Sequence, residues 1–240
     1  ESFSDAGRFA GAAEQRAQCA ALVDAGADIV DIGGQSAITN QPELDAAVEI
    51  DQVVPLVEWV RSTLPGVLVS VDTYKPAVVE AALEAGAHII NDVSGLRYPA
   101  VAESCARAGA ALVVMHTAAP PKVRLQDRDL YGDVVTDVVA FLRERVGQAT
   151  EVGLPWESVI LDPGPDFTKT PAQTVALLRG LDAVWDLGRP VLLALSRKDF
   201  LGAITGRSPR GRDAATAAAI ACLATRAGGD RAGARRRRDG

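Results

Sequence analysis

Short apolar runs alternate with amphipathic stretches along most of the 240-residue chain. Such runs fit buried strands of a parallel sheet, and the stretches between them fit helices that cross back over that sheet. The sequence therefore predicts a series of βα units. We expect strands at Ile29–Gly33, Val67–Asp72, His88–Asp92, Ala111–His116, Val159–Asp162 and Val191–Ser196.

Helix boundaries follow from proline and glycine. We expect helices at Gly11–Ala25, Pro42–Thr63, Pro76–Ala85, Pro99–Ala108, Val134–Val152, Thr170–Leu187 and Arg212–Ala227. Three of them start at a proline, where the missing N–H costs nothing. Ala-Gly-Ala recurs at residues 25–27, 85–87 and 108–110, where a glycine can form the left-handed helix end. This recurrence supports a chain built from repeated units.

Polar residues decide between an open sheet and a barrel. Neither GxGxxG nor GxxxxGK[ST] occurs, although an open nucleotide-binding sheet normally carries one of these phosphate loops. Polar side chains instead follow many strands, a pattern that favours a (β/α)8 barrel with one site shared by all strand ends. They are Asp31, Asp72, Asn91, Asp92, His116, Asp162, Ser196, Arg197 and Lys198.

Each of these positions also has a structural interpretation when it is taken alone. An aspartate after a strand, such as Asp72 or Asp92, can cap the next helix. His116 can be a buried structural histidine, and the charges of Arg197 and Lys198 can be solvated. These alternatives do not explain why all the positions fall on one face of consecutive units, so we favour a ligand site.

Charge and cysteine usage narrow the class of partner. The formal net charge is −6, and nine arginines fall between Arg207 and Gly240, so the rest of the chain is strongly acidic. That balance disfavours nucleic acid and anionic membranes. The three cysteines lack CxxC spacing, which indicates a reducing compartment, and no apolar run reaches the roughly 20 residues of a membrane span. We therefore expect a cytoplasmic protein with small-molecule partners.

Six ordered motifs together resemble one family. They are Ser2-Phe3-Ser4-Asp5, Asp31-Ile32-Gly33-Gly34-Gln35-Ser36, Ser70-Val71-Asp72-Thr73-Tyr74-Lys75, Ile90-Asn91-Asp92-Val93, Asp162-Pro163-Gly164 with Phe167, Lys169 and Thr170, and Ser196-Arg197-Lys198. Their order and spacing, from residue 1 to about residue 228, resemble those of dihydropteroate synthases.

The resemblance implies a pterin-binding (β/α)8 barrel. Its reaction joins 6-hydroxymethyl-7,8-dihydropterin pyrophosphate to p-aminobenzoate and releases pyrophosphate with the help of Mg²⁺, in folate biosynthesis. It also implies a homodimer.

The resemblance further implies roles for individual residues. Asp72, Asn91, Asp162 and Lys198 would bind the pterin ring, and Met115 and Phe167 would form the wall of its pocket. Phe3 and Asp5 match a loop that closes over the reacting centre, and Mg²⁺ and arginine would stabilise the charge on the departing pyrophosphate. We expect Asp5, Arg197 and Lys198 to be catalytic, and the metal ligands are not assigned.

Some positions depart from the family pattern. Ala37-Ile38-Thr39-Asn40 stands where Thr-Arg-Pro-Gly is typical, so contacts to p-aminobenzoate are open. Ala194 and Asp166 replace glycines, and the second substitution predicts a new charge beside the pterin ring. Asp199 stands where a hydroxyl residue is common.

The two ends depart further. We expect residues 1–228 to form the barrel without its first and eighth strands, and residues 229–240 to be a disordered Arg-rich tail, as in a truncated or shifted reading of a gene. In the family those strands supply groups that hold metal and pyrophosphate. We therefore expect the chain to turn over at least about a hundredfold more slowly than a version with both strands restored. The alternatives are a pterin-binding paralogue without synthase activity, a pterin-dependent methyltransferase domain, and an RNA- or membrane-associated scaffold.

Overall fold

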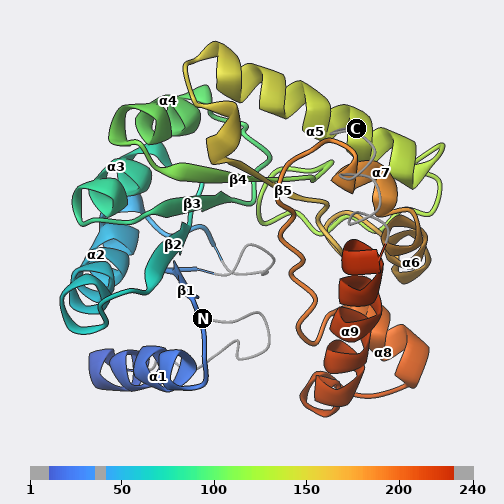
Figure 1. The fold of residues 1–240 in the computed structure, drawn as a ribbon, viewed down its shortest axis with the longest axis horizontal. Helices are drawn as coiled ribbons and strands as arrows, with labels where there is room; N and C mark the ends of the chain where they lie inside the picture. The colour runs from blue at the N-terminus through green and yellow to red at the C-terminus, as the bar shows by residue number, and fades with distance from the viewer. Residues whose placement is uncertain (1–10, 36–41, 230–240) are drawn as a thin grey trace, which may run out of the picture.

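The computed structural model describes residues 11–35 and 42–229. Within them one parallel sheet runs in chain order, and Figure 1 shows it curving with helices α1 to α5 along its outer side. The expected barrel architecture is thus present as an arc of strands. The strands are β1 (Ile29–Gly33), β2 (Leu68–Asp72), β3 (Ile89–Asp92), β4 (Ala111–Met115) and β5 (Val159–Asp162).

Helices follow the strands as the βα pattern predicts. The α-helices are α1 (Ala12–Asp24), α2 (Ala46–Thr63), α3 (Pro76–Glu84), α4 (Pro99–Ala108), α5 (Val134–Glu151), α6 (Pro171–Arg179), α7 (Asp182–Trp185), α8 (Asp199–Thr205) and α9 (Asp213–Gly229). Short 3₁₀ turns lie at Trp156–Ser158 and Pro209–Gly211. None of the described helices is both long and apolar enough to cross a membrane.

The Ala-Gly-Ala turns form as expected. Gly26, Gly86 and Gly109 have φ values of 98°, 99° and 69°, in the left-handed region that glycine adopts without strain. In each turn the residue after the glycine donates its N–H back to the helix, as Ala27 does to Leu22 O at 3.0 Å. The helix end therefore feeds directly into the next strand.

Side-chain alternation divides each strand between two environments. Residues on one face, including Val30, Val69, Ile90 and Leu112, join the helices in the main hydrophobic core. The opposite face points to the inside of the curved sheet, because successive side chains in a strand alternate. Asp31, Asp72, Asn91, Met115 and Asp162 lie on this inner face, at or next to the carboxyl ends of their strands.

The sixth expected strand, Val191–Ser196, is wrong. Only Val191 pairs with the sheet, through a single parallel bridge to Leu161. Leu192 donates to Leu161 O at 2.8 Å, and the chain then leaves the sheet with Leu192 itself 36% exposed. A strand in a parallel sheet is stabilised by partners on both edges, and no described segment pairs with the far edge here.

Two helix predictions also need correction, and one helix was missed. Helix α2 begins at Ala46, after Pro42, because the Asp45 side chain caps it by accepting from Ala47 N at 2.8 Å. The expected helix Thr170–Leu187 is two helices, α6 and α7, broken near Gly180. A Cβ there would lie 2.6 Å from Val135 Cγ2, so the close approach of α5 requires glycine. Helix α8 was not predicted.

The start of α6 provides a test of local stability. Thr170 and Gln173 form a capping box, in which Gln173 Oε1 accepts from Thr170 N at 2.7 Å and Thr170 Oγ1 accepts from Gln173 N at 3.3 Å. Thr170→Ala should lower the free energy of unfolding by about 1 kcal/mol, measured by urea denaturation. Thr170→Ser keeps the hydroxyl and should lose much less. Equal losses in the two variants would contradict the capping role.

Candidate functional site

Three of the four residues predicted to bind a ring, Asp72, Asn91 and Asp162, lie at or next to the carboxyl ends of neighbouring strands. Parallel pairing places Asp72 opposite Asn91 and Met115 opposite Asp162. Asn91 Nδ2 donates to Asp31 Oδ2 at 3.2 Å, which joins the ends of β1 and β3 across β2. The other amide atom, Asn91 Oδ1, is buried and has no hydrogen-bond partner within the described residues. It is therefore an acceptor available to a ligand.

Electrostatics show that the acidic groups share one environment. Desolvation raises the pKa of Asp72 well above its usual value, and the charges of Asp31 and Glu49 raise it further. Desolvation also raises the pKa of Asp162, and the charge of Lys198 partly offsets that rise. Asp31, by contrast, is exposed at the end of β1. An N–H donor or a cation entering this site would stabilise the charged forms of Asp72 and Asp162.

Lys198 approaches the site from the far side, at the N-terminus of α8. It is 4% exposed, and its Nζ donates to Pro165 O at 2.8 Å. The same Nζ lies 4.4 Å from the centroid of the Phe167 ring. Desolvation lowers the pKa of Lys198, and among the charges that raise it the carboxylate of Asp162 has the largest effect. The four predicted ring-binding residues thus interact within one site.

A small apolar cluster lines the same region, separate from the main core. Tyr74, Val93 and Met115 are buried, and Phe167 packs against them. Met115 and Phe167 thus belong to one apolar cluster, and their role as the wall of a ring pocket stays a prediction. Flat apolar side chains beside hydrogen-bonding groups are typical of pockets for small planar ligands.

The loop 162–169 is held by a fully buried lysine. Lys169 Nζ donates to Gly164 O at 2.9 Å, to Phe167 O at 3.0 Å and to His116 Nδ1 at 2.8 Å. Desolvation is the largest cause that lowers the pKa of Lys169, to about 7. Gly164 has a φ of 65°, and a Cβ there would lie 2.2 Å from His116 O. Only glycine fits between the two strand ends at this point.

The structure supports the structural interpretation of His116 and Asp92. His116 is buried, receives the bond from Lys169, and meets the Phe141 ring at a centroid distance of 4.8 Å. Burial lowers its pKa, so the ring is neutral. Asp92 accepts from Ser94 N at 2.7 Å and from Leu96 N at 3.0 Å, so it shapes its own loop.

The Asp166 carboxylate, which the sequence predicts as a new charge beside the ring, is hydrogen-bonded through both of its oxygens, and its place beside a ring stays a prediction. Its Oδ1 accepts from Thr174 Oγ1 at 3.0 Å, and its Oδ2 accepts from Phe200 N at 3.1 Å. The carboxylate thus links helices α6 and α8 through donors on both of them. Asp166 has a φ of 63°, which accounts for the glycine usual at this position.

Arg197 lies at the edge of the site in an ion pair. Its Nε and one terminal nitrogen contact Asp213 of α9 at 2.6 and 3.1 Å. Two residues further along the chain, Asp199 forms an ion pair with Arg212 at 3.1 Å. The catalytic role of Arg197 stays a prediction. Phe3, Asp5, residues 37–40 and the arginines at 231 and 235–238 lie outside the described residues.

Sequence reasoning missed the buried carboxylate of Glu49. It accepts from Thr73 Oγ1 at 2.9 Å, Lys75 Nζ at 2.8 Å and Gln35 Nε2 at 2.8 Å. It therefore ties the segment after β1 to the segment after β2. Its signal was present, because Glu49 shares the helical spacing of Val53 and Val57 and so lies on an apolar stripe.

The described residues do not form a metal site by themselves. Within residues 11–35 and 42–229, no group of three or more acidic, histidine or cysteine side chains is placed to hold an ion. Mg²⁺ is usually bound by one or two carboxylates together with substrate phosphates. The expected Mg²⁺ therefore stays a prediction without assigned ligands.

Solved structures of dihydropteroate synthases are similar to this chain in sequence and in fold. A solved Xanthomonas albilineans dihydropteroate synthase with 4-aminobenzoic acid has 37% sequence identity and a TM-score of 0.81, covering 88% of this chain and 75% of that one. The Thermus thermophilus enzyme has 40% identity and a TM-score of 0.80, covering 87% and 79%.

Curated relatives carry the same name. A Mycobacterium leprae dihydropteroate synthase is 40% identical over 230 residues, 93% of this chain and 80% of its own length. A probable bifunctional folylpolyglutamate synthase/dihydropteroate synthase of Haloferax volcanii is 40% identical over 225 residues, which is 94% of this chain but 26% of that protein. The family described as pterin binding enzyme matches residues 1–232. This chain therefore belongs to the pterin-binding enzyme family.

Proposed function

We propose that the protein is a dihydropteroate synthase, which joins 6-hydroxymethyl-7,8-dihydropterin pyrophosphate to p-aminobenzoate and releases pyrophosphate. The convergence of Asp72, Asn91, Asp162 and Lys198 on one site carries the proposal. Relatives that align with most of the chain are synthases of this kind, and one solved relative is a complex with 7,8-dihydropteroate.

The site offers a donor and acceptor pattern that suits a pterin ring. Asp162 would accept from the adjacent ring N–H and exocyclic amino group as a fork, since a carboxylate has two acceptor oxygens. The unpartnered Asn91 Oδ1 and the Asp72 carboxyl would take further ring donors. Lys198 would donate to the ring carbonyl, with Phe167 and Met115 against the flat faces.

The reaction needs charge stabilisation more than a strong base. The bond between the pterin methylene carbon and the pyrophosphate oxygen breaks, and pyrophosphate leaves with the electron pair. The arylamine nitrogen then bonds to that carbon and loses a proton. Lys198 and Arg197 would supply positive charge near these steps. When bound with the substrate, Mg²⁺ would neutralise charge on the departing pyrophosphate.

The direct test is an assay of the chain with dihydropterin pyrophosphate, p-aminobenzoate and Mg²⁺. Labelled p-aminobenzoate allows the product to be measured by chromatography. Formation of labelled dihydropteroate supports the proposal. Calorimetric binding of a dihydropterin without any product would instead favour the paralogue that binds a pterin and lacks synthase activity.

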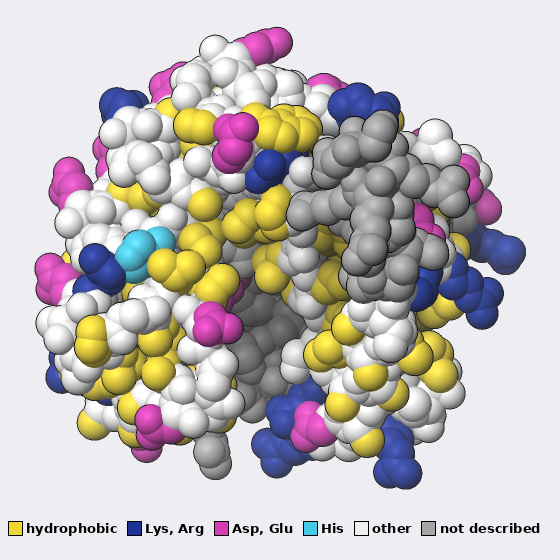
Figure 2. Space-filling view, in the orientation of Figure 1, with side chains coloured by type: hydrophobic (Ala, Val, Ile, Leu, Met, Phe, Trp, Pro, Cys, Tyr) yellow, Lys and Arg dark blue, Asp and Glu magenta, His cyan; other side chains and the backbone are white. Residues whose placement is uncertain are grey.

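A homodimer and a cytoplasmic location also belong to this proposal. Exposed apolar side chains on α8 and α9 support association, since Ile204 is 65% exposed and Ile220 is 52% exposed. Figure 2 shows apolar side chains spread over these two helices at the lower right. Cys19, Cys105 and Cys222 are free thiols, which is consistent with a reducing compartment.

Asp162→Asn should weaken binding of a dihydropterin by about 2–4 kcal/mol, roughly 30- to 1000-fold, in calorimetric titration. The amide replaces one acceptor of the proposed fork with a donor, which leaves a mismatch in a buried site. Asp129→Asn changes the same functional group on a side chain that is 88% exposed and should leave the affinity unchanged. Unaltered binding in Asp162→Asn would place the fork elsewhere.

Lys169 predicts a specific dependence of stability on pH. Its pKa is lowered to about 7 in the folded state, against an ordinary value of 10.5. Between these values the unfolded chain binds more protons, so this residue makes the free energy of unfolding rise with pH, by up to about 1.4 kcal/mol per pH unit.

Lys169→Met removes the titrating group and should flatten that rise, as measured by urea denaturation from pH 7 to 10. Arg128→Met removes a positive charge from a side chain that is 89% exposed and should leave the rise in place. A slope that survives in Lys169→Met would show that another group causes it.

A further inference from the structure

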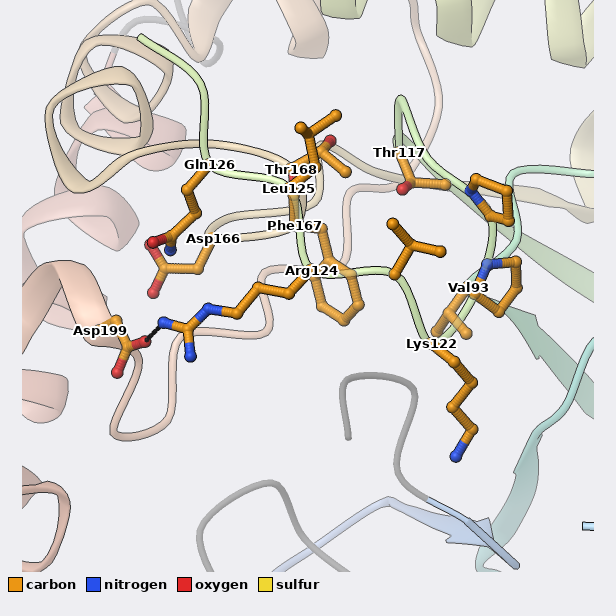
Figure 3. Close-up of a pocket in the computed structure, with 13 residues that line it drawn as sticks. Val93, Thr117, Lys122, Arg124, Leu125, Gln126, Asp166, Phe167, Thr168 and Asp199 are labelled. Atoms are coloured by element: carbon orange, nitrogen blue, oxygen red, sulfur yellow. Dashed lines mark hydrogen bonds and ion pairs between the residues drawn. The ribbon is translucent and has the colours of Figure 1, made fainter. Parts of the chain in front are cut away.

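The loop between β4 and α5 forms one wall of a cavity of about 170 Å³ beside the ring-binding cluster. Val93 and Phe167 of that cluster line the cavity together with Pro120, Pro121 and Lys122. Figure 3 shows the loop passing over Phe167, with Lys122 and Arg124 on opposite sides of it. The loop thus brings two cations to the edge of the proposed pterin site.

The backbone at Lys122 is strained. Its φ is 67°, in the left-handed region that glycine adopts at lower cost than residues with a side chain. The residue lies at the third position of a turn closed by Val123 N donating to Pro120 O at 3.2 Å. A turn with positive φ at this position normally has glycine there. The turn therefore carries a lysine side chain at a position where glycine would cost less.

The two cations of the loop are directed differently. Arg124 pairs with Asp199 at 3.4 Å. Lys122 extends away from Arg124, as Figure 3 shows. Desolvation lowers the pKa of Lys122, and the charge of Lys75 lowers it further. The charges of Glu43, Glu49 and Asp72 raise it. Those residues flank the end of β2, and Lys122 itself lines the cavity together with Val93 and Phe167.

We propose that Lys122 is a further substrate-binding residue, which contacts the anionic group of a substrate at the mouth of the site. The inference rests on the proposed function, whose substrates carry a pyrophosphate and a carboxylate. A lysine ammonium binds either anion as a point charge. The turn holds the cation beside the ring pocket before the substrate arrives, which lowers the cost of ordering the side chain on binding.

The first experiment measures binding, so that it does not depend on turnover. Wild-type protein is titrated with inorganic pyrophosphate and, separately, with 4-aminobenzoate. Lys122→Met should weaken one of the two about tenfold or more, and Lys122→Arg should restore most of the loss. The affected anion identifies which substrate Lys122 contacts. Unchanged affinity for both anions would overturn the proposal.

Arg128→Met is the matched control, because Arg128 lies in the same loop with its side chain 89% exposed. It should change neither affinity. If the wild-type chain forms no dihydropteroate, the proposed function fails, whereas the anion titrations still decide the role of Lys122. If turnover is measurable, Lys122→Met should raise KM for the same substrate.

Lys122→Gly separates a binding role from a structural one. Glycine relieves the strain of the left-handed backbone, so the midpoint of thermal unfolding should rise by about 2–4 °C. The same variant should lose anion affinity as Lys122→Met does. A variant that is less stable and binds both anions normally would assign Lys122 to the structure of the loop and contradict the proposal.

Discussion

The Lys169 ammonium holds together the part of the molecule on which the site depends. Its three hydrogen bonds join the end of β4, at His116, to the loop after β5, at Gly164 and Phe167. That loop carries both Asp162 and the Phe167 ring, so their positions follow from one buried cation. Burial of a charge is costly unless every donor is satisfied, and here the ammonium has three acceptors.

A second buried group organises the opposite side of the mouth. Glu49 binds Gln35, Thr73 and Lys75, and thereby fixes the chain directly after β1 and β2. Asp72 lies at the end of β2, between these segments and Asn91. The site therefore stands between two buried hydrogen-bonded networks, one on each side. Side chains that are already fixed suit a ligand recognised by hydrogen bonds, because less conformational entropy is lost when the ligand binds.

The pattern of neighbouring residues in the chain was sufficient to predict most strands and helices. It was insufficient where the outcome depended on contacts with distant segments. The strands from β1 to β5 and the Ala-Gly-Ala turns follow from apolar runs and glycine positions that lie close together in the chain. Val191–Ser196 has the composition of a strand, yet only Val191 pairs, since pairing depends on a neighbour and not on composition. Asp166 likewise has a charge in the sequence, but its direction depends on donors from α6 and α8.

The sequence by itself determined the βα organisation, the parallel sheet and the polar residues that share one edge of it, because strand alternation and strand ends are local properties. It also carried the resemblance through which Asp72, Asn91, Asp162 and Lys198 were chosen. Only the tertiary structure decided that His116 is structural, that the Asp166 carboxylate bonds to α6 and α8, and that Glu49 joins the segments after β1 and β2. Those outcomes depend on contacts between segments far apart in the chain, where burial and distance set the energy of each polar group.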